Sequence, residues 1–293
     1  MFTDIIQQAV NGLMLGSVVA LPALGLTLIF SVLGSINFSV AAQMTAGAYA
    51  GWMVNTYLGW PLVPCLIAAF VIAAGIGVAG DRIALAPLRK KASASTPLMV
   101  AVVSIALNLA LENVFRFSFG NGLNSYNFEI ARDIRIGDIR LGPQQFRNMV
   151  IALVITAGLA AFFNFTRIGK AMRGVADNPD LARLKGISPA NLSTMATAIG
   201  MGLAGIGGAL LAIDTSVDPL TGSRLLLVIF AAAVVGGLGS LGGAVAGALL
   251  VGLASELSLL AIPPVYQSGI AFVAIMLVLT VRPSGLFSAK TRV

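Results

Sequence analysis

The chain has 293 residues, of which 58% are hydrophobic and 10% are charged, and its formal net charge is +7. Soluble domains carry about 25% charged residues, so the composition excludes a water-soluble fold and predicts an all-α, polytopic membrane helical bundle. The basic excess does not indicate nucleic-acid binding, because the Lys and Arg residues lie in short segments between apolar runs, as the positive-inside rule expects.

The first span is expected at about residues 9–33, and the uncharged interruption 34–43 follows it. Apolar sequence resumes at 46–57. The interruption is either an ordinary short loop or the break of a discontinuous helix whose freed backbone groups line a pathway. If the helix is discontinuous, the candidate pathway residues in this region are Asn37, Phe38, Gln43 and Gly47.

Two further spans are expected at about 62–80 and 96–119, and the basic loop between them is assigned to the cytoplasm. Glu112 lies well inside the second of these spans. An acid in a membrane span is either a functional group or a structural partner, here for Arg116 one helical turn later. Residues 120–147 have mixed charge and form the longest polar segment, which we place outside. Ile residues alternate with its charges in a pattern typical of short strands.

Spans at about 149–165 and 191–213 flank the cytoplasmic segment 166–190. Within this segment, Asp177-Asn178-Pro179-Asp180 is a helix-start signal with an N-cap candidate, a Pro near the first helical position and an acid in the first turn. Gly186 is the corresponding stop signal. The segment therefore predicts a short amphipathic helix outside the membrane, with a surface suited to docking on a partner. The residues available for its one apolar side are Leu181, Ala182, Leu184 and Ile187.

The number of spans in the C-terminal region decides on which side of the membrane the C-terminus lies. A single span over 225–253 and a last one over 266–281 would leave the C-terminus outside, but Arg282, Lys290 and Arg292 favour the inside. A break in the Gly-rich stretch 236–243, giving two crossings or a re-entrant pair, reconciles the charges. We therefore expect eight to ten membrane segments, including broken or re-entrant helices.

The same Gly-rich stretch supplies the remaining candidate pathway residues, Gly236, Gly237, Gly239 and Ser240. It has two interpretations: close helix packing by small residues, or a broken helix beside a translocation pathway. A nucleotide-binding loop is excluded, because the sequence contains no Gly-x-x-x-x-Gly-Lys-Ser/Thr. The sequence also has no His and a single Cys, Cys65, so we expect no catalytic residues, no metal site and no cofactor.

Residues 169–188 resemble the coupling-loop motif of ABC transporter permeases of the branched-chain amino acid type, most closely the LivH-type member of the permease pair. Gly174 stands where that motif commonly has Ala. Residues 34–49, 235–247 and 282–287 resemble three further motifs of the family, so the resemblance covers essentially the whole chain. The candidate coupling residues are Gly169, Ala171, Arg173, Asp177, Asn178, Pro179, Ala182, Gly186 and Ile187.

The resemblance implies a single transmembrane permease domain over 1–293, with the coupling loop at 166–190 and the external loop at 120–147. It implies a multi-pass protein of the bacterial inner membrane that translocates branched-chain amino acids or a related small organic solute. The implied partners are a second homologous permease subunit, two ATP-binding subunits that bind and hydrolyse ATP, a periplasmic substrate-binding protein and membrane lipid. The permease itself would not be an enzyme. A stand-alone secondary transporter or channel is the alternative.

Overall fold

The computed structural model describes residues 2–89, 95–128, 134–136, 139–263, 266–282 and 285–287. The described chain is largely helical. Its helices are α1 (Phe2–Leu33), α2 (Val40–Leu58), α3 (Leu62–Gly80), α4 (Ala86–Arg89), α5 (Thr96–Phe119), α6 (Pro143–Phe165), α7 (Arg167–Asp177), α8 (Pro179–Leu184), α9 (Pro189–Asp214), α10 (Thr221–Gly236), α11 (Leu241–Ser258) and α12 (Gln267–Val281). A π-helical turn, Asp81–Leu85, joins α3 to α4, and the strands are β1 (Ile134–Ile136) and β2 (Ile139–Leu141).

Six helices in the described part of the chain are long and apolar enough to cross a membrane. They are Thr3–Leu33, Leu62–Arg89, Thr96–Phe119, Pro143–Phe165, Pro189–Asp214 and Leu241–Ser258. Thr221–Gly236 and Gly269–Val281 are apolar but shorter. The helical membrane fold is therefore confirmed, and the expected count of eight to ten membrane segments stays a prediction.

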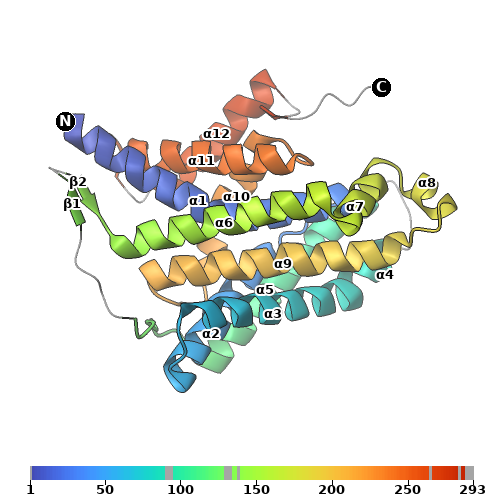
Figure 1. The fold of residues 1–293 in the computed structure, drawn as a ribbon, viewed down its shortest axis with the longest axis horizontal. Helices are drawn as coiled ribbons and strands as arrows, with labels where there is room; N and C mark the ends of the chain where they lie inside the picture. Colours follow the sequence, from blue (N-terminus) through green and yellow to red (C-terminus); the bar gives the residue numbers. More distant parts are fainter. Residues whose placement is uncertain are drawn as a thin grey trace.

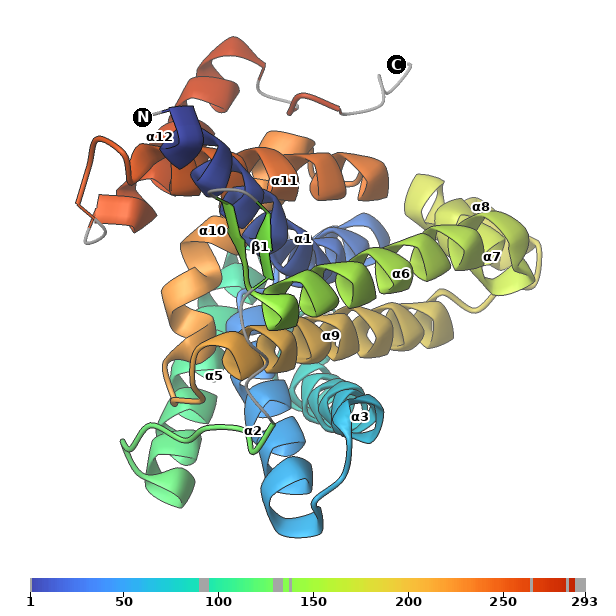
Figure 2. The same cartoon turned by 60° about the vertical axis from the view of Figure 1, so that its left-hand side comes forward.

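Helices α1 and α9 form the centre of the bundle. Helix α1 packs against α6, α9 and α11, and α9 packs against α1, α2 and α3; Figures 1 and 2 show α6, α9 and α3 side by side. Glycines allow the closest approaches, because a Cβ at Gly25 would collide with the Gly200 carbonyl and one at Gly47 with the Gly205 backbone. Such close backbone contact is the usual way in which membrane helices associate without a hydrophobic driving force.

The two ends of the bundle carry different elements (Figure 1). At one end, which we call the hairpin end, strands β1 and β2 pair as an antiparallel hairpin, which confirms the expected short strands. The Gln7 side chain bonds both the N–H and the C=O of Arg140, at 2.8 and 2.9 Å, so the start of α1 lies at this end. At the other end, the α8 end, lie α7, α8 and the turn between α10 and α11.

Both predicted breaks interrupt the helices. Helix α1 ends before Gly34, whose φ is +68°, and α2 starts at Val40. Helices α10 and α11 are separated at Gly237 and Gly239, with φ of +107° and +101°. Gly reaches these conformations without the steric penalty that other residues incur. The prediction that 225–253 is interrupted within its Gly-rich stretch is therefore confirmed.

Two boundaries differ from the sequence-based expectation. Helix α6 begins at Pro143, so the last residues of the predicted 120–147 loop are helical, because Pro is pre-organised for the first turn of a helix. Helix α1 begins at Phe2 instead of near residue 9. The charges of Lys290 and Arg292, and Pro283 and Ser284 of the last motif, lie outside the described residues.

Candidate functional site

The candidate site is built on the corner where α6 turns into α7. Thr166 caps α7, since its Oγ1 accepts a hydrogen bond from the Gly169 N–H at 3.0 Å and donates one to the Phe162 carbonyl at 2.7 Å. A Cβ at Gly169 would lie 2.5 Å from the Phe163 Cα, so only glycine permits this approach. Helix α7 is therefore folded tightly back on the end of α6.

Arg173 bonds to the same corner from the exposed side of α7. Its Nη2 donates to the Phe163 carbonyl at 2.8 Å, and its Nη1 donates to Asn164 Oδ1 at 3.4 Å. Met172 and Val175 are buried on the neighbouring face of α7, where they pack in a cluster with Leu192 of α9. We predicted Arg173 as a coupling residue, and these bonds also make its guanidinium a contact that holds α7 to the end of α6.

Helix α8 starts and stops where the sequence signals predict. Asn178 Oδ1 accepts a hydrogen bond from the Leu181 N–H at 2.9 Å, which is an N-cap, and Pro179 is the first helical residue. At the other end Gly186 has φ of +76°, and the Ile187 N–H donates to the Ala182 carbonyl at 3.0 Å. This is the Schellman geometry that glycine favours at the end of a helix.

The apolar residues of α8 point in two directions. Ala182 is 4% exposed and packs in the cluster with Met172 and Val175, and Ile187 packs against the same cluster. Leu181 and Leu184 are 51% and 85% exposed. We had expected all four to form one apolar side, which is wrong. Leu181 and Leu184 form an exposed apolar pair that is absent from the candidate coupling residues. Figure 2 shows that their helix, α8, lies at the edge of the molecule beside α7.

A cavity of about 450 Å³ lies beside this corner. Its lining includes Arg173 and Asp177 of α7 and Gly239 and Gly242 of the Gly-rich stretch. Two groups predicted from separate motifs, the coupling residues and part of the candidate pathway, therefore meet at the α8 end. The last motif reaches the same place, since the Leu286 and Phe287 N–H groups donate to the Val235 and Gly236 carbonyls at 2.9 and 3.2 Å.

The candidate pathway residues around 37–47 lie in a second group, inside the bundle. Asn37 Oδ1 accepts hydrogen bonds from the Ser39 N–H and hydroxyl at 3.1 and 2.7 Å. The Phe38 ring packs on Phe230, with 5.5 Å between ring centroids. Gln43 is fully buried, and neither its Nε2 nor its Oε1 has a hydrogen-bond partner among the described residues.

The glycines among the candidate pathway residues are contact points between helices. Gly47 packs on the backbone of Gly205, and Gly236 packs on that of Gly243. Ser240 caps α11, its Oγ accepting from the Gly243 N–H at 3.1 Å. The structure therefore supports the packing interpretation for Gly47 and Gly236, and a pathway role for either stays a prediction.

Comparison with known proteins identifies the family. The family model described as "Branched-chain amino acid transport system / permease component" matches residues 8–279. The high-affinity branched-chain amino acid transport system permease protein LivH of Escherichia coli (strain K12) is 28% identical, covering 97% of this chain and 96% of the relative. BraD, the corresponding permease protein of Pseudomonas aeruginosa, is also 28% identical, covering 96% and 95%. Since the family match spans nearly the whole sequence, the chain belongs to the branched-chain amino acid transport system permease family.

Proposed function

We propose that the chain is the transmembrane permease subunit of an ABC importer that translocates branched-chain amino acids or a related small organic solute. The relatives are named as branched-chain amino acid transport permeases over almost the whole length of this chain. The observation that carries the proposal is the exposed apolar pair Leu181 and Leu184 on a capped helix outside the membrane bundle. Exposed apolar residues grouped in this way are typical of a protein–protein contact.

The proposed mechanism uses α8 as the point of contact with an ATP-binding subunit. Leu181 and Leu184 enter a groove on that subunit. Helix α8 is joined to α7 through the Asn178 cap, and α7 is held to α6 by Arg173 and Gly169. A push on α8 therefore moves the ends of membrane helices as a rigid unit. Such motion switches the pathway between outward and inward access when the ATP-binding pair closes.

The complete transporter contains a second, homologous permease, two ATP-binding subunits and a periplasmic substrate-binding protein, in the inner membrane of a bacterium. ATP binds and is hydrolysed on the partner subunits, so this chain is not an enzyme and needs no cofactor of its own. The whole chain forms one permease domain of eight to ten membrane segments. Its α8 end faces the cytoplasm and its hairpin end faces the periplasm, in agreement with the basic residues around α7 and α8.

Co-purification tests the docking step. A charge at position 184 would be buried without a partner in the proposed groove, so Leu184→Asp should reduce the amount of ATP-binding subunit recovered with the permease about tenfold or more. Leu123→Asp is the matched control. Leu123 is also exposed, at 71%, but it lies in the polar segment after α5, away from α8. Leu123→Asp should leave the recovery unchanged.

Two results would contradict the proposal. One is equal recovery of the ATP-binding subunit with Leu184→Asp and with the wild-type chain. The other is solute movement by the purified chain alone in liposomes, driven by an ion gradient without ATP. The second result would favour the alternative, a stand-alone secondary transporter or channel.

A further inference from the structure

Helix α5 buries a polar stripe in the middle of a membrane span. Ser104, Asn108 and Glu112 recur every four residues and are 0%, 4% and 7% exposed. Asn108 lies at the midpoint of α5, whereas the opposite face of the helix exposes apolar residues such as Val102 and Leu109. A stripe of this kind is costly to bury in a membrane and marks either an interhelical contact or a pathway for a polar solute.

The stripe faces the first turn of α10. The Ser223 hydroxyl donates to Glu112 Oε2 at 2.6 Å and accepts from Asn108 Nδ2 at 3.3 Å. Glu112 Oε1 pairs with Arg116 Nη2 at 2.9 Å, which confirms the predicted ion pair. Asn108 Oδ1 is buried and has no hydrogen-bond partner among the described residues. The buried Asn108 Oδ1 is thus available to accept a hydrogen bond from a ligand.

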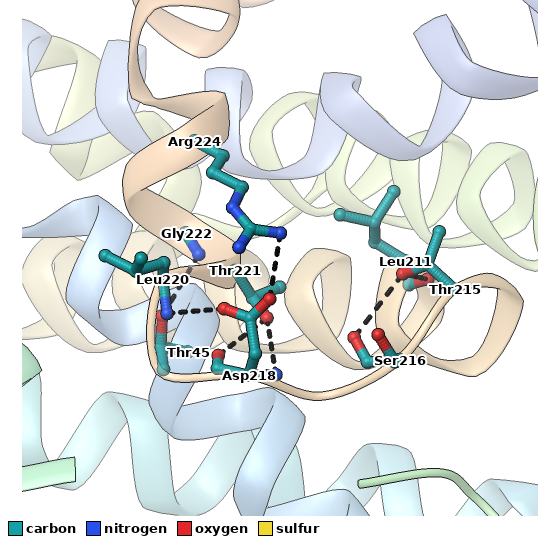
Figure 3. A network of polar contacts seen from close by, with 9 residues as sticks. All are labelled: Thr45, Leu211, Thr215, Ser216, Asp218, Leu220, Thr221, Gly222 and Arg224. Atoms are coloured by element: carbon teal, nitrogen blue, oxygen red, sulfur yellow. Dashed lines mark hydrogen bonds and ion pairs between the residues drawn. The ribbon is translucent and has the colours of Figure 1, made fainter. Parts of the chain in front are cut away.

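Arg224, the residue after Ser223, forms a second ion pair, with Asp218. Arg224 Nη1 lies 2.9 Å from Asp218 Oδ2, and Asp218 Oδ1 accepts a bond from the Leu220 N–H at 2.6 Å (Figure 3). The Gly222 N–H donates to Thr45 Oγ1 of α2 at 3.1 Å, so this turn is anchored inside the bundle. The Asp218 side chain is 7% exposed and the Arg224 side chain is 66% exposed. A buried carboxylate therefore pairs with a guanidinium side chain that is largely exposed.

The guanidinium of Arg224 is exposed beside a residue that bonds to the middle of a membrane span. Ser223, the neighbour of Arg224, bonds to the midpoint of α5, and a charged group in the hydrocarbon core of a membrane is costly. Leu227, one turn further on the same side of α10, is also exposed. Because a charge in hydrocarbon is costly, an exposed guanidinium at this place is most stable where this face of α10 borders water.

We infer that Arg224, Ser223, Glu112 and Asn108 form a site in the translocation pathway that binds a zwitterionic α-amino acid. The guanidinium of Arg224 pairs with the substrate carboxylate, for which its planar fork is suited. Glu112, with the unpaired oxygen of Asn108, accepts bonds from the substrate ammonium. Asp218 and Arg116 are positioning residues that orient the two charged groups. The inference rests on the proposed function and names the contacts that an importer of amino acids would use.

Cysteine accessibility tests whether the face borders water. The chain has a single cysteine, so Cys65→Ser gives a background in which one new thiol can be followed in the assembled transporter. Leu227→Cys should react with a cationic methanethiosulfonate reagent. Val154→Cys is the matched control. Val154 lies at the midpoint of the apolar, largely exposed helix α6 and is 66% exposed, compared with 46% for Leu227. Its thiol should stay unmodified. A Leu227→Cys thiol as inert as the Val154→Cys thiol would overturn the inference.

Binding of radiolabelled leucine tests the ligand. The assembled transporter, without binding protein or nucleotide, should bind leucine, and Arg224→Gln and Glu112→Gln should each raise its Kd about tenfold or more, as expected for a hydrogen bond to a charged group. Arg224→Lys should restore part of the affinity. Arg89→Gln, which breaks the Arg89–Asp81 pair at 2.6 Å outside the site, should leave the Kd unchanged.

The outcomes separate the two proposals. Wild-type Kd values in both Arg224→Gln and Glu112→Gln, or no leucine binding by the wild-type transporter, would overturn the binding site while ATP-driven uptake persists. Absence of ATP-driven uptake of any branched-chain amino acid or related solute by the wild-type transporter would instead overturn the proposed function, whatever the cysteine reactivity at position 227.

Discussion

Replacing Gly169 by Ala should displace the coupling segment. The added Cβ would lie 2.5 Å from the Phe163 Cα and 2.6 Å from the Phe162 carbonyl oxygen. Both neighbours are backbone atoms of α6 and cannot rotate away. Helix α7 would have to retreat by about 1 Å to restore ordinary van der Waals separation, and overpacking of this kind costs about 1–3 kcal/mol. The same shift would strain the Arg173 bonds to Phe163 and Asn164.

Gly174→Ala supplies the matched comparison on the same helix. A Cβ at Gly174 meets nothing within 4 Å, so the change should stabilise α7 by up to about 1 kcal/mol through helix propensity. In the assembled transporter, Gly169→Ala should lower the apparent melting temperature by several degrees and reduce uptake per ATP hydrolysed, whereas Gly174→Ala should do neither. Indistinguishable behaviour of the two variants would refute the idea that close packing of α7 on α6 transmits the motion.

Two other substitutions probe local and tertiary contacts. Asn178→Ala removes the cap of α8 and should cost about 1 kcal/mol, seen as faster amide hydrogen exchange over 179–185; unchanged exchange would mean that tertiary packing alone holds the helix. Gly208→Ala places a methyl group against the Met44 carbonyl of α2 and should destabilise the bundle by about 1–3 kcal/mol. Gly158→Ala, with open space around it, should not lower the melting temperature, and a loss equal to that of Gly208→Ala would argue against specific helix contact.

Much of the fold follows from local signals in the sequence. The apolar runs predict the helices that cross the membrane, because burial of backbone polar groups in lipid leaves little choice but a helix. Asn178, Pro179 and Gly186 predict both ends of α8, because capping bonds and a positive φ involve only neighbouring residues. The break between α10 and α11 was predicted from the glycines at 236–243 and from the basic residues after the last span, which favour an inside C-terminus.

The candidate site was predicted less completely, because the side of a helix that faces its neighbours depends on how the helices pack. Sequence alone grouped Leu181 and Leu184 with Ala182, but α8 lies with Ala182 against α7 and α9 and leaves the two leucines exposed. Arg173 was predicted as a coupling residue, and the structure adds a bond from its guanidinium to the end of α6 that the sequence did not predict. Both features depend on how α7 and α8 pack against α6 and α9.

The sequence by itself determined that this is a helical membrane protein of the permease family, with a short capped helix between residues 166 and 190. Only the tertiary structure decided that Glu112 shares a hydrogen bond with Ser223, a residue 111 positions further along the chain, and that the buried Asp218 pairs with the exposed Arg224. The physical reason is that caps and turns are short-range, whereas polar contacts between membrane helices depend on which small-residue faces pack together. Those contacts exist only after α2, α5 and α10 have been brought side by side.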